Sequence, residues 1–424
     1  MSDFPQLFRV RQSFPRPRED DLEGAVERQL NQLHLDRSIQ PGQSVAVTAG
    51  SRGITNIGEI VRAIVAFLRG LGAEPFLVPA MGSHGGATAD GQRKVLEAYG
   101  VTEAFCGCPI RSSMETVVVC RSVEGFPVHF DHLAFAADHV LVCGRVKPHT
   151  QFSGPIGSGL LKMLLIGLGK HAGAKVYHAA FQDFSFDRIV RSVAERVIRE
   201  CHVVGGVAIL ENAYDETARI VGVPPERFAS QEPELLKLAT DWMPRLPFRQ
   251  ADVLVIDEIG KDISGAGMDT NVIGRKEGSD EPVGDEPISI KRIVARSLTR
   301  GSGGNAVGIG IADVCTRRLA DAIDRRKTVI NAVTAAHFGA AKIPPVLETD
   351  RQALEMVLQT IGLTPPADAR LLWIRNTLDL EEVECSAAYL DQARARGDLE
   401  ILSGLHQLPL DERGNLPPTV AHFM

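Results

Sequence analysis

Three of the histidines and one of the lysines between residues 84 and 178 are candidates for moving protons or binding a metal. His84 lies in a loop beside three glycines, a setting that provides backbone donors but no packing for an imidazole. This favours a catalytic or ligand-binding role over that of an exposed loop histidine. His149 lies in a second loop and His178 further along the chain. All three imidazoles can exchange protons near neutral pH.

The lysine, Lys162, stands in an apolar run from Leu160 to Leu168. A helix over this run would be apolar all round and therefore buried. A buried ammonium must be desolvated, so such a lysine has a partner or a chemical task. The alternative is a lysine whose stem lies along the helix while its amine reaches water. The residues alone leave both interpretations open.

Two segments near these side chains are candidates for binding an anion. A helix that begins after Thr88 presents free amide groups, a natural seat for a phosphate or a carboxylate. The glycine-rich passage that contains Ser153 and Gly154 could cradle a phosphate in the same way. It lacks the Gly-Lys-Ser/Thr ending of a P-loop and the Gly-x-Gly-x-x-Gly pattern of a dinucleotide turn. Conventional ATP or NAD binding is therefore disfavoured.

Strands and helices alternate in the first half of the chain, which predicts an α/β fold with a mostly parallel sheet. The pattern predicts strands over 44–50, 74–79 and 138–143, a helix from Ile57 to Gly70 capped by Thr55-Asn56, and a helix over 89–99. Ligands of such sheets bind beyond the carboxyl ends of the strands. We expect four side chains there: Arg52, His84, Lys147 and His149.

A second α/β unit is predicted to begin with a strand over 251–257, followed by strands over 306–311, 328–333 and 370–374. We predict an N-terminal cofactor-binding and catalytic domain over 1–247, a C-terminal domain over 248–400, a cleft between them, and a tail over 401–424 that could pack on the N-terminal domain. The first loop of the second unit contains Lys261 and Arg275, candidates for holding a carboxylate or phosphate. In the same loop, Asp269 and Asn271 fit either a substrate contact or an ordinary Asx turn.

Length and composition exclude several classes of protein. A chain of 424 residues suggests two domains. The net charge is -7 without a basic block, so nucleic acid is not an expected partner. No apolar run reaches the roughly 18 residues that cross a membrane, and the polar N-terminus has no signal core. Seven scattered cysteines fit reduced thiols. A cytoplasmic enzyme is the expectation.

The order of a Gly-x-His loop, a second histidine, a glycine-rich passage, a lysine and a later histidine resembles the nickel-dependent lactate racemase family. The resemblance implies a nickel-pincer nucleotide (nickel pyridinium-3,5-bisthiocarboxylic acid mononucleotide), attached to Lys162 and absent from recombinant apoprotein made without its biosynthesis enzymes. It also implies that His178, rather than the competing His171, coordinates nickel, and that His84 and His149 are the proton donor and acceptor. Cofactor binding would involve Arg52, Thr88, Ser153 and Gly154; substrate binding would involve Arg52, Lys147, Lys261 and Arg275.

The family resemblance implies a racemase or epimerase that inverts C2 of a small 2-hydroxy acid. Removing the C2 proton is hard because the neighbouring carboxylate is already anionic, whereas moving a hydride avoids a carbanion. Reaction in both directions then needs a proton acceptor on each side of the substrate. Ala49 stands where the family has an acid before the arginine. This departure points to a divergent member that acts on another 2-hydroxy acid.

Two other functions fit the same residues. A divalent-metal hydrolase or lyase would use His84, His149 and His178 as direct ligands and would be indifferent to Lys162. A non-catalytic protein would bind a hydroxy acid or a nucleotide without chemistry at C2. The sequence leaves the oligomeric state open.

Overall fold

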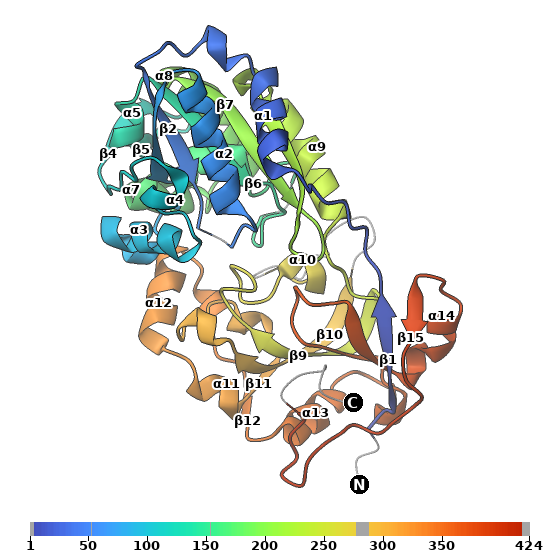
Figure 1. Ribbon diagram of the computed structural model, residues 1–424. Coiled ribbons are helices and arrows are strands. Elements are labelled where there is room, and N and C mark those ends of the chain that lie inside the picture. Colours follow the sequence, from blue (N-terminus) through green and yellow to red (C-terminus); the bar gives the residue numbers. More distant parts are fainter. Residues whose placement is uncertain (1–3, 52, 153, 277–287, 418–424) are drawn as a thin grey trace. The chain divides into compact units, whose positions relative to one another are not determined.

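The structure, a computed structural model, describes residues 4–51, 53–152, 154–276 and 288–417 (Figure 1). The chain divides into two compact units. One comprises Arg16–Met243, and the other combines Met1–Pro15 with Pro244–Met424. Each unit has its own sheet and its own hydrophobic core. The α/β fold class predicted from the sequence is confirmed.

The unit of residues 16–243 is built on a five-stranded sheet with the strand order β3-β2-β6-β7-β8. The strands are β2 (Ser44–Ala49), β3 (Glu74–Pro79), β6 (His139–Arg145), β7 (Val203–Glu211) and β8 (Thr217–Val223). Neighbours among the first four pair in parallel, and only β8 is antiparallel to its neighbour β7. The prediction of a mostly parallel N-terminal sheet is confirmed. Its connections are therefore crossovers, which place helices on both faces of the sheet.

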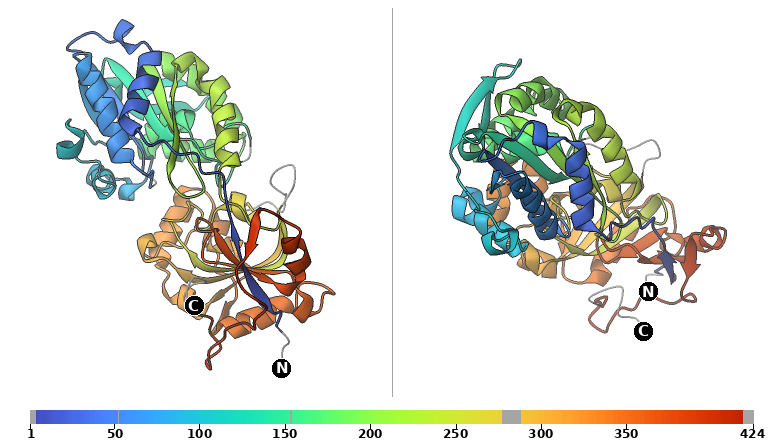
Figure 2. Two further views of the ribbon diagram at one scale, coloured as in Figure 1. Left: turned by 45° about the vertical axis from the view of Figure 1, so that its right-hand side comes forward. Right: turned by 45° about the horizontal axis from the view of Figure 1, so that its top comes forward.

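Helices cover both faces of this sheet (Figure 2). Along β2, Val45 and Val47 face one core and Ala46 faces the other, as the two-residue period of a strand requires. One core includes α1 (Leu22–Gln32) and α2 (Ile57–Gly70); the other includes α8 (Phe186–Glu200) and α9 (Phe228–Asp241). The apolar face predicted for α2 is buried as expected: Ile57, Ile60, Val61, Ile64, Val65 and Leu68.

Smaller elements surround the sheet. They are α3 (Ala89–Ala98), α4 (Glu103–Cys106), α5 (His132–Phe135), and a separate antiparallel pair, β4 (Thr116–Arg121) with β5 (Pro127–Asp131). Asn56 precedes α2 as predicted, but its side chain does not cap the helix. Asn56 has a left-handed backbone with φ of 61°, and its side chain donates to Thr217 Oγ1 at 3.3 Å instead of capping the helix.

The apolar run that follows the second candidate loop is not one regular helix. It consists of α6 (Leu160–Lys162), a π-helical turn over Met163–Gly167, and α7 (Lys170–Ala180). Single π-helical turns widen a helix and are frequent at functional sites. Gly167 explains the close packing, because a Cβ atom there would lie 2.8 Å from the carbonyl oxygen of Ala80.

The other unit has an eight-stranded sheet with the order β12-β11-β10-β9-β13-β14-β1-β15. Its strands are β1 (Leu7–Gln12), β9 (Gln250–Ile259), β10 (Ser289–Leu298), β11 (Val314–Thr316), β12 (Val346–Leu347), β13 (Leu371–Ile374), β14 (Glu382–Ser386) and β15 (Leu399–Ile401). Pairing is parallel from β12 to β13, and antiparallel from β13 through β14 and β1 to β15. Its helices are α10 (Thr270–Ile273), α11 (Arg317–Asp321), α12 (Arg325–Thr334), α13 (Asp350–Leu358) and α14 (Leu390–Arg394).

Two of the strands predicted for this unit are wrong. Residues 328–333 lie in α12, which begins where the Asp324 side chain accepts from the Lys327 amide at 3.0 Å. Within 306–311, Ile309–Ile311 forms a short 3-10 helix after Gly308, whose φ is 103°. The strand predicted over 370–374 is present as β13, whereas β10 was not expected. β-Branched residues alone do not decide between strand and helix.

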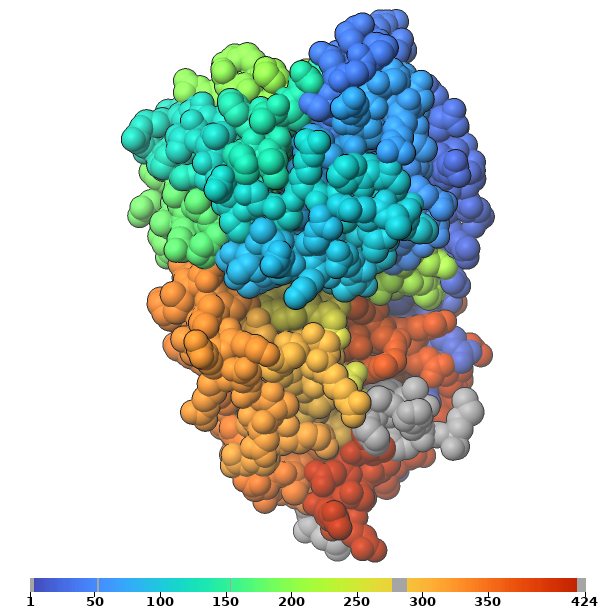
Figure 3. Space-filling model, turned by 60° about the vertical axis from the view of Figure 1, so that its left-hand side comes forward, coloured from blue at the N-terminus to red at the C-terminus, as the bar shows by residue number. Residues whose placement is uncertain are grey.

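The grouping of the chain ends differs from the predicted domains. Residues 1–15 belong with residues 244–424, because β1 lies between β14 and β15. Part of this N-terminal segment lies against C-terminal residues in Figure 3. The described tail also packs in this unit, where Leu416 donates its amide to Asp350 Oδ2 at 2.9 Å. All seven cysteines are free, and no helix among the described residues could span a membrane.

Candidate functional site

The candidate side chains of the unit 16–243 lie at the carboxyl ends of its parallel strands. His84 follows β3, and Lys147 and His149 follow β6. The π-helical turn lies against the same strand ends, because Gly82 donates its amide to the Gly167 carbonyl at 3.1 Å. Met163 packs against Gly50 and Gly144. A Cβ atom added to these glycines would lie 3.6 and 2.8 Å, respectively, from the Met163 side chain. Glycines at the ends of β2 and β6 therefore allow the turn to approach the sheet.

Lys162, the last residue of α6, directly precedes this turn and is half-buried. Its Nζ donates to Ser158 Oγ at 3.1 Å. The backbone of Ser158 pairs with that of Lys147 through two hydrogen bonds of 2.8 Å, which close the loop that carries His149. The amine of Lys162 is thus directed toward the candidate loop and is not enclosed in the core.

A buried carboxylate holds the start of α6. Glu232 of α9 is 1% exposed, and its Oε2 accepts from the Leu161 amide at 3.0 Å. A Cβ atom on Gly159 would lie 2.3 Å from its Oε1, so only glycine fits there. Burial raises the pKa of Glu232 to about 7, although the Leu161 and Leu160 amides act in the opposite direction. Glu232 thereby holds the backbone of Leu161, the residue directly before Lys162.

His178 lies on α7, and its electrostatic environment links it to Lys162. Burial lowers the pKa of His178 to about 4, and the positive charge of Lys162 adds to the shift. The imidazole is therefore neutral, the form in which histidine binds metals. The pKa of the competing His171 is also lowered by burial, but the neighbouring charge there is that of Lys175. The charge of Lys162 therefore contributes to the lowered pKa of His178, and the charge of Lys175 contributes to that of His171.

A row of aromatic rings joins His149 to His178. The His149 ring stacks on Phe152, with centroids 4.6 Å apart, and Phe152 contacts Phe181 at 4.8 Å. Phe181 meets the His178 ring edge to face at 5.8 Å. Phe186, which is buried, stacks on Phe152 at 5.0 Å. Sequence reasoning missed these phenylalanines, although two of them, Phe152 and Phe181, each follow a candidate histidine by three positions.

His84 is oriented by Ser51, whose Oγ lies 2.5 Å from His84 Nδ1. The loop that carries His84 is held by Gln92, whose Nε2 donates to the Gly82 carbonyl at 2.8 Å. Behind Gln92, the fully buried Lys170 donates to Gln92 Oε1 at 3.3 Å and pairs with Asp131 Oδ2 at 3.0 Å. The fully buried lysine of this region is therefore Lys170, whereas the half-buried Lys162 fits the alternative in which its amine is not enclosed.

The other candidate anion-binding residues have local roles or lie outside the described residues. Arg52 and Ser153 belong to the latter. Thr88 caps α3, because its Oγ1 accepts from the Gly91 amide at 3.1 Å. Gly154 is exposed and has a φ of 140°. A phosphate cradle over these residues stays a prediction.

Lys261 and Arg275 lie in the other unit. Lys261 Nζ donates to the Gly265 carbonyl at 2.5 Å. Arg275 donates to Asp313 Oδ2 at 2.8 Å and to the Ile311 and Ile290 carbonyls at 2.9 Å, so its guanidinium joins β10 to the segment before β11. Asp269 accepts from the Asn271 amide at 3.0 Å, which is the Asx turn expected as an alternative. Substrate contacts by Lys261 and Arg275 stay predictions.

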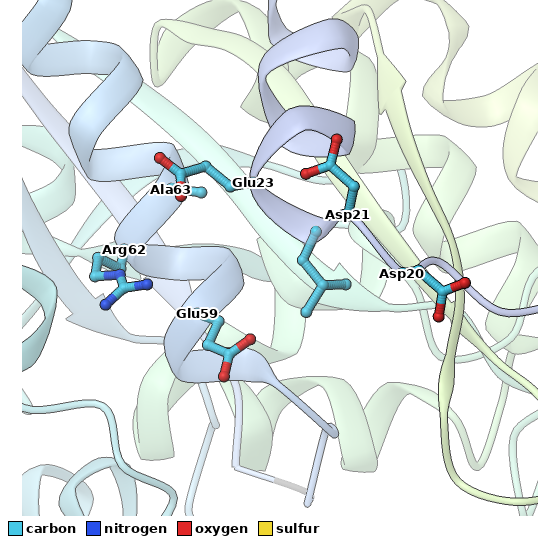
Figure 4. Close-up of a pocket in the computed structure, with 7 residues that line it drawn as sticks. Asp20, Asp21, Glu23, Glu59, Arg62 and Ala63 are labelled. Atoms are coloured by element: carbon cyan, nitrogen blue, oxygen red, sulfur yellow. The ribbon is translucent and has the colours of Figure 1, made fainter.

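A surface pocket in the first unit lies away from these side chains (Figure 4). It is lined by Asp20, Asp21, Glu23, Glu59 and Arg62, among others, from the start of α1 and from α2. Four carboxylates against one guanidinium disfavour an anionic substrate there. Within the described parts of the chain, no three histidine, cysteine or acidic side chains are grouped to hold a metal ion. A direct metal site made by His84, His149 and His178 therefore lacks support.

Residues 7–185 match the family described as the lactate racemase N-terminal domain. Residues 7–185 of this chain therefore belong to the lactate racemase N-terminal domain family. The matched segment contains all four candidate side chains, His84, His149, Lys162 and His178, so the family resemblance seen in the sequence is confirmed. This match over residues 7–185 supports an isomerase of the racemase kind.

Among solved structures, the chain is similar to the lactate racemase apoprotein from Thermoanaerobacterium thermosaccharolyticum. The two chains share 10% sequence identity, with a TM-score of 0.49, over 88% of this chain and 99% of the other. The comparison with curated proteins gives no match.

Proposed function

We propose that this chain, whose residues 7–185 match the lactate racemase N-terminal domain, inverts C2 of a small 2-hydroxy acid, as a racemase or epimerase, with a nickel-pincer nucleotide attached to Lys162. The supporting observation is the placement of Lys162 and His178 together on the segment that packs against the strand ends. The proposal includes the cofactor biosynthesis enzymes as partners and a cytoplasmic location.

The side chains present fit this cofactor. The Lys162 amine is half-buried and directed to the candidate loop, so an acyl group on it would lie beside that loop. Acylation would remove the ammonium charge that acts on His178. His178 offers a neutral imidazole, which suits nickel as a ligand. Lys162 and His178 would therefore hold the group, which when bound supplies an acceptor and donor for the C2 hydride.

The remaining steps belong to the chain's own side chains. His84 and His149 would take up and return the proton of the substrate hydroxyl, one on each side of C2. Lys147 would bring a positive charge for the substrate carboxylate. Phe152 and Phe181, whose rings lie between His149 and His178, would exclude water from the reacting atoms.

Whole-protein mass spectrometry tests the proposal. The chain is produced together with the cofactor biosynthesis enzymes, and we expect a large covalent adduct that Lys162→Arg abolishes. Lys175→Arg is the matched control, because Lys175 is an exposed lysine of the nearby α7. The loaded protein is then screened for inversion at C2 with a panel of 2-hydroxy acids. An adduct that survives Lys162→Arg, or inversion at C2 without any adduct, would contradict the proposed function.

A further inference from the structure

The Nδ1 atoms of the two candidate acid/base histidines have different hydrogen-bond partners. Nδ1 of His149 accepts from the backbone amides of Gln151 at 3.0 Å and Phe152 at 3.3 Å. A backbone N–H can only donate. Nδ1 of His149 must therefore present a lone pair, and a neutral ring then carries its proton on Nε2.

His84 has a partner of another kind. Its Nδ1 lies 2.5 Å from Ser51 Oγ. A hydroxyl can donate or accept, so Ser51 can support Nδ1 with or without a proton. The loop around His84 is fixed independently, because Gln92 donates to the carbonyls of Gly82 and His84. Ser51 therefore affects the protonation of the ring and is not needed to hold the loop.

We propose that the fold fixes one tautomer of His149 before the substrate binds, whereas it leaves both tautomers open to His84. His149 is a neutral hydrogen-bond donor through Nε2, and His84, with Ser51 as its positioning residue, is the imidazole that can take up a proton. This difference stands on the described contacts alone, whereas its use in turnover rests on the function proposed above.

The arrangement restricts what His149 can do. With the proton on Nε2, that nitrogen has no lone pair for the proton of a substrate hydroxyl. Adding a proton at Nδ1 would direct an N–H group at two other N–H groups. A ring flip is hindered as well, because the imidazole stacks on Phe152 at 4.6 Å and on Phe186 at 5.9 Å. His149 can therefore act as a base only after the 149–152 loop has released Nδ1.

Nitrogen-15 NMR of the full-length apoprotein, labelled at histidine, tests the proposal. Long-range proton–nitrogen correlations at pH 7 distinguish the two tautomers and the cation, and His149→Gln and His84→Gln assign the signals. We expect His149 to be neutral with its proton on Nε2. A His149 that is cationic at pH 7, or that carries its proton on Nδ1, would overturn the proposal.

Variants of Ser51 test its positioning role. Ser51→Ala should change the tautomer ratio of His84 and leave His149 unchanged, and Ser51→Thr, which keeps the hydroxyl, should restore the ratio. Ser83→Ala is the matched control, since Ser83 lies in the same loop as His84. An unchanged His84 in Ser51→Ala would overturn the role of Ser51. None of these measurements needs the cofactor, so failure of the proposed function would appear separately, as a missing adduct on Lys162.

Discussion

At the scale of single residues, the chemistry around the candidate site depends on which charged groups the fold buries. Lys162 and Lys170 are eight positions apart, yet Lys170 is fully buried and Lys162 is half-buried. Burial lowers the pKa of Lys170, while Asp131 acts in the opposite direction. The sequence could not show which lysine is buried, because its partner Asp131 lies 39 positions away and is brought close only by folding.

The Lys170–Asp131 pair leads to a prediction about stability. Lys170→Met would leave Asp131, which is 0% exposed, without a compensating charge, and should destabilise the protein by about 3–5 kcal/mol. The double variant Lys170→Met/Asp131→Asn should recover part of this loss, because it removes the stranded charge. Urea unfolding would measure both. The exposed Lys175→Met serves as the control and should change stability little. A single variant as stable as the wild type would contradict the role of the pair.

The candidate acid/base histidines lead to a second prediction. His84→Ala and His149→Ala should each abolish inversion at C2 and leave the adduct on Lys162 in place, because neither ring is assigned to hold the cofactor. Whole-protein mass and C2 label exchange would be measured on the same samples. His132→Ala, a partly exposed histidine of α5, should affect neither readout. Loss of the adduct from His84→Ala or His149→Ala would mean that their roles are misassigned.

At the scale of elements, the sequence predicted what local pattern determines. The parallel strands, the apolar face of α2 and the loops at the strand ends follow from periodicity and glycine placement. The π-helical turn was not predictable, because it depends on contacts between distant segments, such as Gly167 against the Ala80 carbonyl. The strand predicted over 328–333 was wrong because the β-branched residues of this segment suggested a strand. Its β-branched residues lie on α12, where Val329, Ile330 and Val333 are exposed.

Glu232 links the start of α6 to the pH dependence of stability. Its pKa in the folded protein is raised to about 7 from an ordinary value of 4.5. The folded state therefore binds the proton more tightly than the unfolded chain, and its stability should fall as the pH rises from 4.5 to 7. By linkage, this loss is at most about 3 kcal/mol.

Glu232→Gln should remove this part of the pH dependence, since glutamine stays neutral. Between pH 5 and pH 8, the free energy of unfolding of the wild type should therefore fall relative to that of the variant. Glu234→Gln, an exposed residue of the same helix α9, should leave the pH dependence as it is. Parallel curves for the wild type and Glu232→Gln would show that the carboxyl is not protonated more readily in the folded state.

At the scale of the whole molecule, the chain forms its second unit from both of its ends. β1 pairs with β14 across about 375 positions, as in Phe8 opposite Cys385. A local pattern contains no information about such a partner, so the sequence placed residues 1–15 in the N-terminal domain. The pairing is reinforced by Arg9, whose Nε donates to the buried Glu384 Oε1 at 2.9 Å.

This grouping predicts different behaviour for two fragments. Residues 16–243 contain their complete sheet and should fold alone, whereas residues 244–424 should not, because they lack β1. Leu7, Phe8 and Val10 of β1 are fully buried, which is worth on the order of 6 kcal/mol, comparable to the whole stability of a domain. Removal would also leave Glu384 without Arg9, and β15 without the strand that pairs with it.

Circular dichroism and hydrogen exchange would test both fragments. A peptide of residues 4–15 added to the 244–424 fragment should restore protected amides in β14 and β15, because it supplies the missing strand to both neighbours. The same peptide with Arg9→Met should restore less protection, since the buried Glu384 then lacks the charge of Arg9 and keeps only its contact with His406. If the amides of the 244–424 fragment are fully protected from exchange without the peptide, β1 is dispensable. Residues 244–424 would then fold as a unit without residues 1–15.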